Sequence, residues 1–169
     1  MSYHGEEPAE WTMYKYQRSK AEFTFGEATV IMDVPLPGEH YAQNAMSVSA
    51  IVRTECSQYP AEVICKAAES FKGVERRMNI IGRNKKGVLV VDDYAHNPQK
   101  LAGTVRAIHE ITTGKIFAVF QSTGLKSLNF YKNGIFREME NCLRESDEIC
   151  ILPPYLKYGG YPTVEEVVS

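Results

Sequence analysis

The sequence predicts an α/β protein whose C-terminal half holds a mainly parallel sheet. Three apolar runs of strand length, at 88–91, 116–120 and 148–152, alternate with segments in which apolar residues recur at helical spacing. Strands that alternate with helices favour parallel pairing, because a parallel connection has to cross over the sheet. Upstream, residues 22–25 and 29–34 flank a Gly-containing turn and predict a β-hairpin.

Composition excludes several classes of protein. The chain has 169 residues, enough for one domain or parts of two, and 44% of them are hydrophobic. A net charge of −2 lacks the basic footprint of nucleic-acid binding. No apolar run approaches a membrane span, and the polar, acidic first residues predict no signal peptide. The four cysteines form no CxxC pair, so we expect reduced thiols in a cytoplasmic protein.

The N-terminal half is predicted to continue into two helices. Pro37 ends the hairpin, and Gly38 allows the turn into a helix of about fifteen residues. His40 and Asn44 stand four apart and therefore share one face near the start of this helix. On spacing alone they could cap the helix or contact a ligand. A second helix is expected from Pro60, with an apolar stripe at Val63, Ile64, Ala67, Ala68 and Phe71.

A charged cluster, Glu75-Arg76-Arg77, follows the Gly73 that ends the second helix. It falls between two structured regions, so we predict a domain junction near residue 75. An arginine pair is commonly a solvated surface cluster. At a junction, however, a guanidinium can also bind phosphate or ribose oxygens, and Arg77 is the candidate.

The chain's main functional candidate is the joint after the strand at 88–91. Asp92 and Asp93 follow that strand, and Asn97 and Pro98 are suited to cap and begin a helix over 98–111. In open α/β sheets, ligands lie outside the carboxyl ends of the strands. An acidic residue there can accept hydrogen bonds from ribose hydroxyls, and the helix N-terminus beyond it favours phosphate.

A second polar segment, residues 121–127, follows the strand at 116–120 and includes Lys126. The strand at 116–120 and its preceding helix are expected to form a right-handed parallel unit with the strand at 88–91. We predict the next helix to begin at Asn133 or Gly134, and a last one near Thr163.

Five segments, in order, resemble those of one enzyme family. Residues 92–98 resemble the DDYxHxP joint of the Mur ligases, ATP-dependent enzymes that add amino acids or peptides to UDP-N-acetylmuramic acid. Residues 37–45 resemble the family's PGxHNxxNA segment, and residues 71–78 its FxGVxRR segment. Residues 119–121 resemble a strand of the alanine-adding ligases, and residues 2–5 the TYG that closes a central-domain strand.

The resemblance implies a domain organisation. Residues 1–75 would be the tail of the family's central, ATP-binding domain, comprising its β-hairpin and last helices. Residues 76–169 would be most of a Rossmann-like C-terminal ligase domain, without its closing strands. The sequence contains no GxxxxGK[ST] phosphate loop. We therefore expect no catalysis by this chain alone, with the Mg²⁺ ligands lying outside it.

The resemblance also implies roles for particular residues. An Asn side chain can read the edge of adenine because it donates and accepts, and Asp93 matches the family's ribose-binding Asp. The nucleotide-binding residues implied for ATP are His40, Asn44, Arg77 and Asp93. His96 is implied to contact the phosphates or the incoming amino acid and is the candidate catalytic residue, and Lys126 is a candidate substrate contact. Tyr41 departs from the family's Asn, and Lys126 lies where the alanine-adding ligases carry arginines.

The function implied is amide-bond formation in peptidoglycan precursor synthesis. The intact enzyme would add L-alanine to UDP-N-acetylmuramate through an acyl phosphate, with ATP and Mg²⁺ and with no nucleic-acid or membrane partner. A murein peptide ligase is the first alternative, because the loop at 121–127 is Ser- and Lys-containing. Folylpolyglutamate synthetase is a further one. A non-catalytic Rossmann-like binding module is the alternative from another class, whereas a dinucleotide oxidoreductase is disfavoured by the lack of GxGxxG.

Overall fold

The computed structural model describes residues 11–17, 20–25 and 28–155 of the chain, which form two compact units, Met1–Asp93 and Tyr94–Ser169. The elements of the first unit, in order, are β1 (Trp11–Gln17), β2 (Lys20–Phe25), β3 (Ala28–Asp33), α1 (Glu39–Glu55), α2 (Ala61–Glu69), β4 (Asn79–Arg83) and β5 (Leu89–Asp92). Those of the second are α3 (Pro98–Ile111), β6 (Phe117–Gln121), α4 (Leu125–Cys142) and β7 (Glu148–Leu152).

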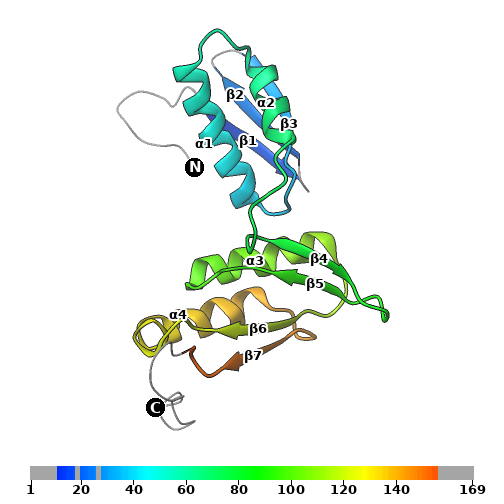
Figure 1. Ribbon diagram of the computed structural model, residues 1–169, viewed down its shortest axis with the longest axis vertical. Coiled ribbons are helices and arrows are strands. Elements are labelled where there is room, and N and C mark those ends of the chain that lie inside the picture. The colour runs from blue at the N-terminus through cyan, green and yellow to red at the C-terminus, as the bar shows by residue number, and fades with distance from the viewer. Residues whose placement is uncertain (1–10, 18–19, 26–27, 156–169) are drawn as a thin grey trace. The chain divides into compact units, whose positions relative to one another are not determined.

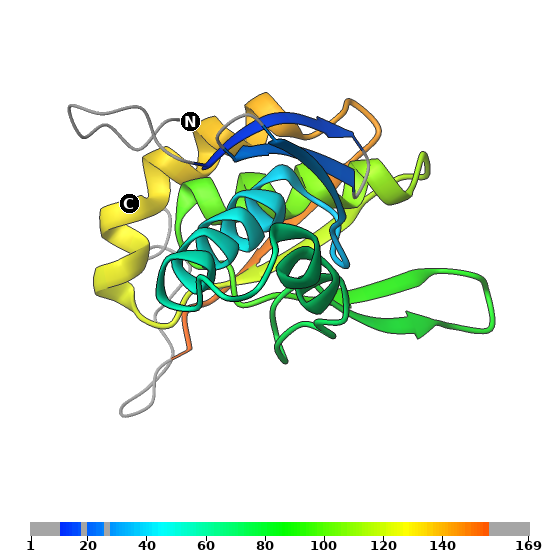
Figure 2. The same ribbon diagram turned by 90° about the horizontal axis from the view of Figure 1, so that it is seen from above.

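A three-stranded antiparallel sheet in the order β1-β2-β3 begins the first unit. Both α1 and α2 cover one face of this sheet, as Figures 1 and 2 show. The predicted hairpin is confirmed as β2 and β3, with β1 added at its edge. The shared core contains Phe23, Met32 and Ala42, each fully buried.

Both predicted N-terminal helices form. Gly38 precedes α1 with φ 108, a left-handed conformation that glycine adopts without a Cβ clash. In α2 the buried residues are Ala61, Ile64 and Cys65. The predicted stripe is therefore partly wrong: Val63 and Ala67 are exposed on the helix, and Phe71 is exposed beyond its end.

An antiparallel hairpin of β4 and β5 ends the first unit. Its turn is held by Asn84, whose Oδ1 accepts hydrogen bonds from the backbone N–H groups of Lys86 and Val88. We predicted that the strand at 88–91 would be buried, and this is wrong. Val90 is 45% exposed, because the two-stranded hairpin buries only part of each strand.

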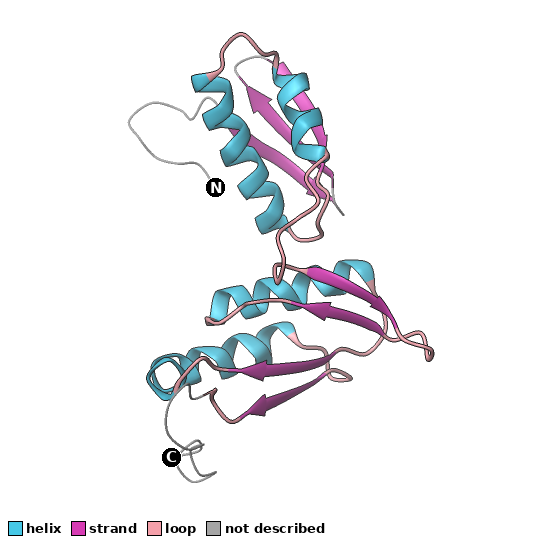
Figure 3. Cartoon of the chain, viewed as in Figure 1, coloured by secondary structure: helices cyan, strands magenta, loops and turns pink. Residues whose placement is uncertain are grey.

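The second unit is built around a parallel pair of strands. Strands β6 and β7 pair in parallel, with α4 as their connection, and α3 packs against α4 (Figure 3). Their inward-facing residues join the helices in a second core that includes Phe120, Ile135 and Met139. The opposite face of β6 carries Phe117 and Val119, each about 60% exposed, so this strand is buried on one face only.

Two predictions about this unit are corrected. Helix α4 begins at Leu125, eight or nine residues before the predicted start at Asn133 or Gly134. Among the described strands, β5 pairs with β4 and not with β6, so the parallel crossover unit is β6–α4–β7. The expected helix near Thr163 and the TYG-like segment at 2–5 lie outside the described residues.

The domain junction predicted near residue 75 stays a prediction. The compact units divide later, after Asp93, so that the β4–β5 hairpin falls in the first unit. No helix of the described residues is long and apolar enough to cross a membrane.

Candidate nucleotide site

The segment at 74–78, between α2 and β4, forms a tight turn with unusual backbone angles. Val74 and Arg77 form an isolated bridge, in which the Arg77 N–H donates to the Val74 carbonyl at 3.1 Å. On either side of Arg77, Arg76 has φ 57 and Met78 has φ 49. Left-handed backbone costs a non-glycine residue about 1–2 kcal/mol, so the surroundings must hold this turn in place.

The two carboxylates at the end of β5 hold the turn. Asp93 Oδ2 accepts a hydrogen bond of 2.7 Å from the backbone N–H of Met78, a residue that is only 1% exposed. The Asp92 carboxylate forms an ion pair with Arg76 at 3.6 Å. Each left-handed residue therefore has one of the two adjacent aspartates as its partner, and the backbone of Arg77 is fixed between them.

The first turn of α1 lies within electrostatic reach of this assembly. Burial and, after it, the Asp93 charge raise the pKa of Tyr41 to about 12, against the opposing effect of the Arg77 charge. The Tyr41 ring also packs against the core of the first unit, with its centroid 4.2 Å from that of His40. The side chains of residues 41, 77 and 93, which are far apart in sequence, therefore interact electrostatically within the first unit.

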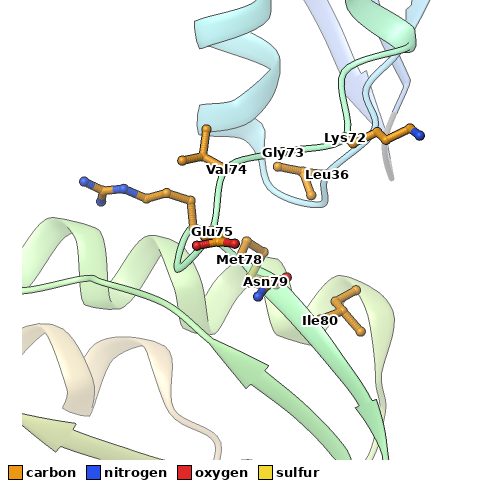
Figure 4. A pocket seen from close by; sticks show the side chains of 9 residues that line it. Leu36, Lys72, Gly73, Val74, Glu75, Met78, Asn79 and Ile80 are labelled. Carbon is orange, nitrogen blue, oxygen red and sulfur yellow. The ribbon is translucent and has the colours of Figure 1, made fainter.

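A hollow of about 310 Å³ adjoins the turn. Figure 4 shows Leu36 and Val74 on one side of it, and Met78, Asn79 and Ile80 on the other. The lining also includes three charged residues, Lys72, Glu75 and Arg77, beside its apolar ones. A cavity that combines apolar walls with a few charged groups is typical of small-ligand sites.

His96 lies just after the joint, in the second unit. Its Nδ1 is 2.9 Å from the carbonyl oxygen of Tyr94, and the two rings are tilted with centroids 5.3 Å apart. A carbonyl can only accept, so Nδ1 carries the proton, and the neutral ring keeps its lone pair at Nε2. Asn97 then caps α3, with its Oδ1 accepting from the Lys100 N–H at 3.0 Å.

The six predicted site residues are not all brought together. Arg77 and Asp93 lie at the turn, His40 lies in the first turn of α1, and the exposed Asn44 is one helical turn further along; all four belong to the first unit. His96 and Lys126 belong to the second unit, where Lys126 is exposed in the first turn of α4. Within the described part of the chain, the hydrogen bonds and ion pairs do not link Lys126 to the other five.

The sequence did not predict the two contacts that hold the turn, Asp93 with Met78 and Asp92 with Arg76. Nothing in the residue types of Arg76 and Met78 indicates left-handed backbone, which Gly, Asn and Asp adopt far more often. Tyr41 was noticed only as a departure from a motif. The one available signal was the Asp92-Asp93 pair itself, whose first member could have been assigned to Arg76 by charge.

Comparisons with known proteins identify the family of this chain. Residues 76–157 match the model of the Mur ligase glutamate ligase domain. The UDP-N-acetylmuramate–L-alanine ligase of Allorhizobium ampelinum is 32% identical over 154 residues, which cover 90% of this chain and 30% of that protein. The chain belongs to the Mur ligase family. It spans about a third or less of the length of the curated relatives it matches.

Solved structures of Mur ligases share the fold. The UDP-N-acetylmuramate–alanine ligase of Thermotoga maritima has a TM-score of 0.60 at 22% identity, covering 88% of this chain and 38% of that one. MurF of Acinetobacter baumannii has a TM-score of 0.65 at 17% identity, covering 87% of this chain and 32% of that one. The predicted α/β class with a Rossmann-like ligase domain is therefore confirmed.

The residues around the turn carry groups that can interact with phosphate and with hydroxyl groups. Arg77 and Lys72 offer cations for phosphate, and the Asp93 carboxylate, held by Met78, offers an acceptor for hydroxyl groups. Within the described ranges, no group of three or more His, Cys, Asp or Glu is placed to hold a metal ion. Mur ligases use ATP and Mg²⁺.

Proposed function

We propose that this chain supplies the adenosine-binding part of an ATP-dependent ligase of peptidoglycan precursor synthesis. The observation that carries the proposal is the convergence of Asp93, Arg77 and the first turn of α1 around a turn of strained backbone. Strained residues persist only where their surroundings impose them, and they cluster at ligand sites. The other parts of the enzyme, with the phosphate loop and the Mg²⁺ ligands, would lie outside the chain.

Asp93 and Arg77 have complementary roles in the proposed site. The Asp93 carboxylate has two oxygens; Oδ2 accepts from Met78 and orients the group, and Oδ1 can accept from a ribose hydroxyl. Arg77 can donate several N–H groups to ribose or phosphate oxygens from a fixed backbone. His40 and Asn44, on one face of α1, would contact the base. Tyr41 would support them, since its ring packs against His40 and interacts electrostatically with Asp93.

His96 and Lys126 are proposed for the substrate side of the reaction. ATP, when bound, supplies the phosphoryl group that activates the muramoyl carboxylate, and the amine then displaces phosphate from the acyl carbon. The amino group of the substrate is an ammonium ion at neutral pH, and it must lose a proton before it can attack. The Nε2 lone pair of His96, left by the Nδ1–H bond to the Tyr94 carbonyl, is able to accept it. Lys126 would interact with an anionic substrate group.

L-Alanine is the amino acid we propose, with UDP-N-acetylmuramate as its acceptor. The support is that relatives which match most of this chain are UDP-N-acetylmuramate–L-alanine ligases. A murein peptide ligase is the second candidate. It is favoured by the loop after β6, where Gln121-Ser122-Thr123 and Lys126 stand in place of the expected arginine run. We expect a cytoplasmic site of action, since the implied nucleotide substrates are cytoplasmic.

The test is a titration of the chain with ADP and Mg²⁺, followed by amide NMR. We expect saturable shifts at Arg77, Asp93 and the first turn of α1. Asp93→Asn should weaken ADP binding about tenfold, because the amide oxygen can still hold the Met78 N–H while the charge is lost. Asp33→Asn, at an exposed aspartate of β3, is the matched control and should bind as the parent does. Equal loss in both variants, or no saturable shift in the parent at millimolar ADP, would contradict the proposal.

A further inference from the structure

The contact between α4 and the first turn of α3 leaves no room for a side chain at Gly134. A Cβ built at this position would lie 2.8 Å from Cγ of Pro98 and 3.5 Å from its Cβ. Carbon atoms normally approach to about 3.5–4.0 Å, so the shorter of these distances is a clash. Pro98 is itself buried and is the first residue of α3.

The Pro98 ring cannot move aside as a flexible side chain would. It is bonded to its own backbone nitrogen, which fixes the ring against the chain. Any atom added at Gly134 would therefore displace the backbone at the start of α3. That backbone carries the Asn97 cap, whose Oδ1 accepts from the Lys100 N–H, and His96 directly before it.

We propose that Gly134 is a positioning residue for His96: because Gly134 has no side chain, α4 packs directly against Pro98, and this contact fixes the Asn97 cap and the orientation of His96. The proposal rests on the function proposed above for His96, but the contact itself does not. Glycine is otherwise a poor choice in the interior of an 18-residue helix, because it loses more chain entropy than alanine. The close approach to Pro98 accounts for it.

The test compares Gly134→Ala with Pro98→Ala and with the double variant. In Gly134→Ala we expect the Lys100 amide resonance and the His96 ring nitrogen resonances to move. In Pro98→Ala the clashing Cγ is absent, so adding Gly134→Ala in that background should leave the same resonances unchanged. Such non-additivity is the signature of a direct contact.

Asn133→Ala is the matched control, because Asn133 is the exposed neighbour of Gly134 in the same helix. It should move neither the Lys100 amide nor the His96 ring. If Gly134→Ala fails to fold, the double variant should recover the fold. Unchanged Lys100 and His96 resonances in Gly134→Ala, equal changes in Asn133→Ala, or no recovery in the double variant would each overturn the proposal.

The two proposals fail in distinguishable ways. If the parent chain does not bind ADP, the proposed function is contradicted, while the resonances of Lys100 and His96 still report on the contact. If ADP binds but the double variant behaves as the sum of the single variants, the role of Gly134 is overturned and the nucleotide site stands.

Discussion

Each unit contains an aspartate whose side chain accepts hydrogen bonds from backbone N–H groups, and the two aspartates differ in the number of these bonds and in their burial. Asp93, in the first unit, accepts a hydrogen bond from Met78 and is partly exposed. Asp147, in the second, has a fully buried side chain that accepts from the backbone N–H groups of Ile116 and Arg144 and lies 2.9 Å from His109 Nε2. These bonds lower the pKa of Asp147 to about 2 although burial opposes them.

The difference indicates which carboxylate is available to a ligand. Every oxygen of Asp147 is used to join the start of β6, the end of α4 and the last turn of α3, so it serves the fold. Asp93 is oriented by the Met78 N–H and stays partly exposed. A carboxylate with one oxygen fixed by a backbone N–H and the other available as an acceptor is suited to bind a hydroxyl group.

Removing the buried aspartate should have the largest effect on stability. Asp147→Ala leaves two backbone donors and His109 without their acceptor, and we expect a loss of about 3 kcal/mol in the free energy of unfolding of the second unit. Asp93→Ala, with one hydrogen bond lost, should cost the first unit about 1 kcal/mol. Urea unfolding followed by amide resonances of each unit measures both, and equal losses would contradict the comparison.

Acid should weaken the second unit through Asp147. Its pKa is about 2 in the folded chain and about 3.9 when unfolded, so the unfolded state binds more protons between these values. The stabilisation is complete well above pH 4 and is lost as the pH falls toward 2. We expect a loss of about 1–2 kcal/mol for the second unit. In Asp147→Asn this part of the pH dependence should disappear; its persistence in that variant would contradict the assignment.

Substitution of Asp92 should have a smaller effect on stability and on ADP affinity than substitution of its neighbour Asp93. Its ion pair with Arg76 is exposed on both sides, and such pairs contribute about 0.2–1 kcal/mol. Asp92→Asn should therefore change the free energy of unfolding by about 0.5 kcal/mol and ADP affinity by less than about twofold. An Asp92 variant that loses ADP as strongly as Asp93→Asn would show that the two carboxylates act together.

Local signals predicted most of the elements. Asn97 and Pro98 mark the start of α3, and the apolar runs mark β6 and β7, because capping and strand periodicity are properties of short segments. The start of α4 was missed since its first turns contain polar residues and Gly134. Packing of Leu128, Ile135 and Met139 into the core makes this segment helical, and that depends on the tertiary fold.

The site was predictable in part for the same reason. Motif resemblance identified Arg77 and Asp93, and the structure adds what holds them. The left-handed angles at Arg76 and Met78 follow from contacts with β5, fifteen residues away in the case of Met78 and Asp93. His109 and Asp147 are 38 positions apart in the sequence, so no local pattern predicts their contact.

The most direct test of the account is to locate the adenosine of bound ADP on the chain. Intermolecular nuclear Overhauser effects between ADP and the chain would do so. The account predicts contacts from the adenine protons to the His40 and Tyr41 rings and from the ribose protons to the turn at Arg77 and Met78. Contacts confined to the second unit, or to the β4–β5 turn at Asn84, would contradict the assignment of Asp93 and Arg77 as the nucleotide site.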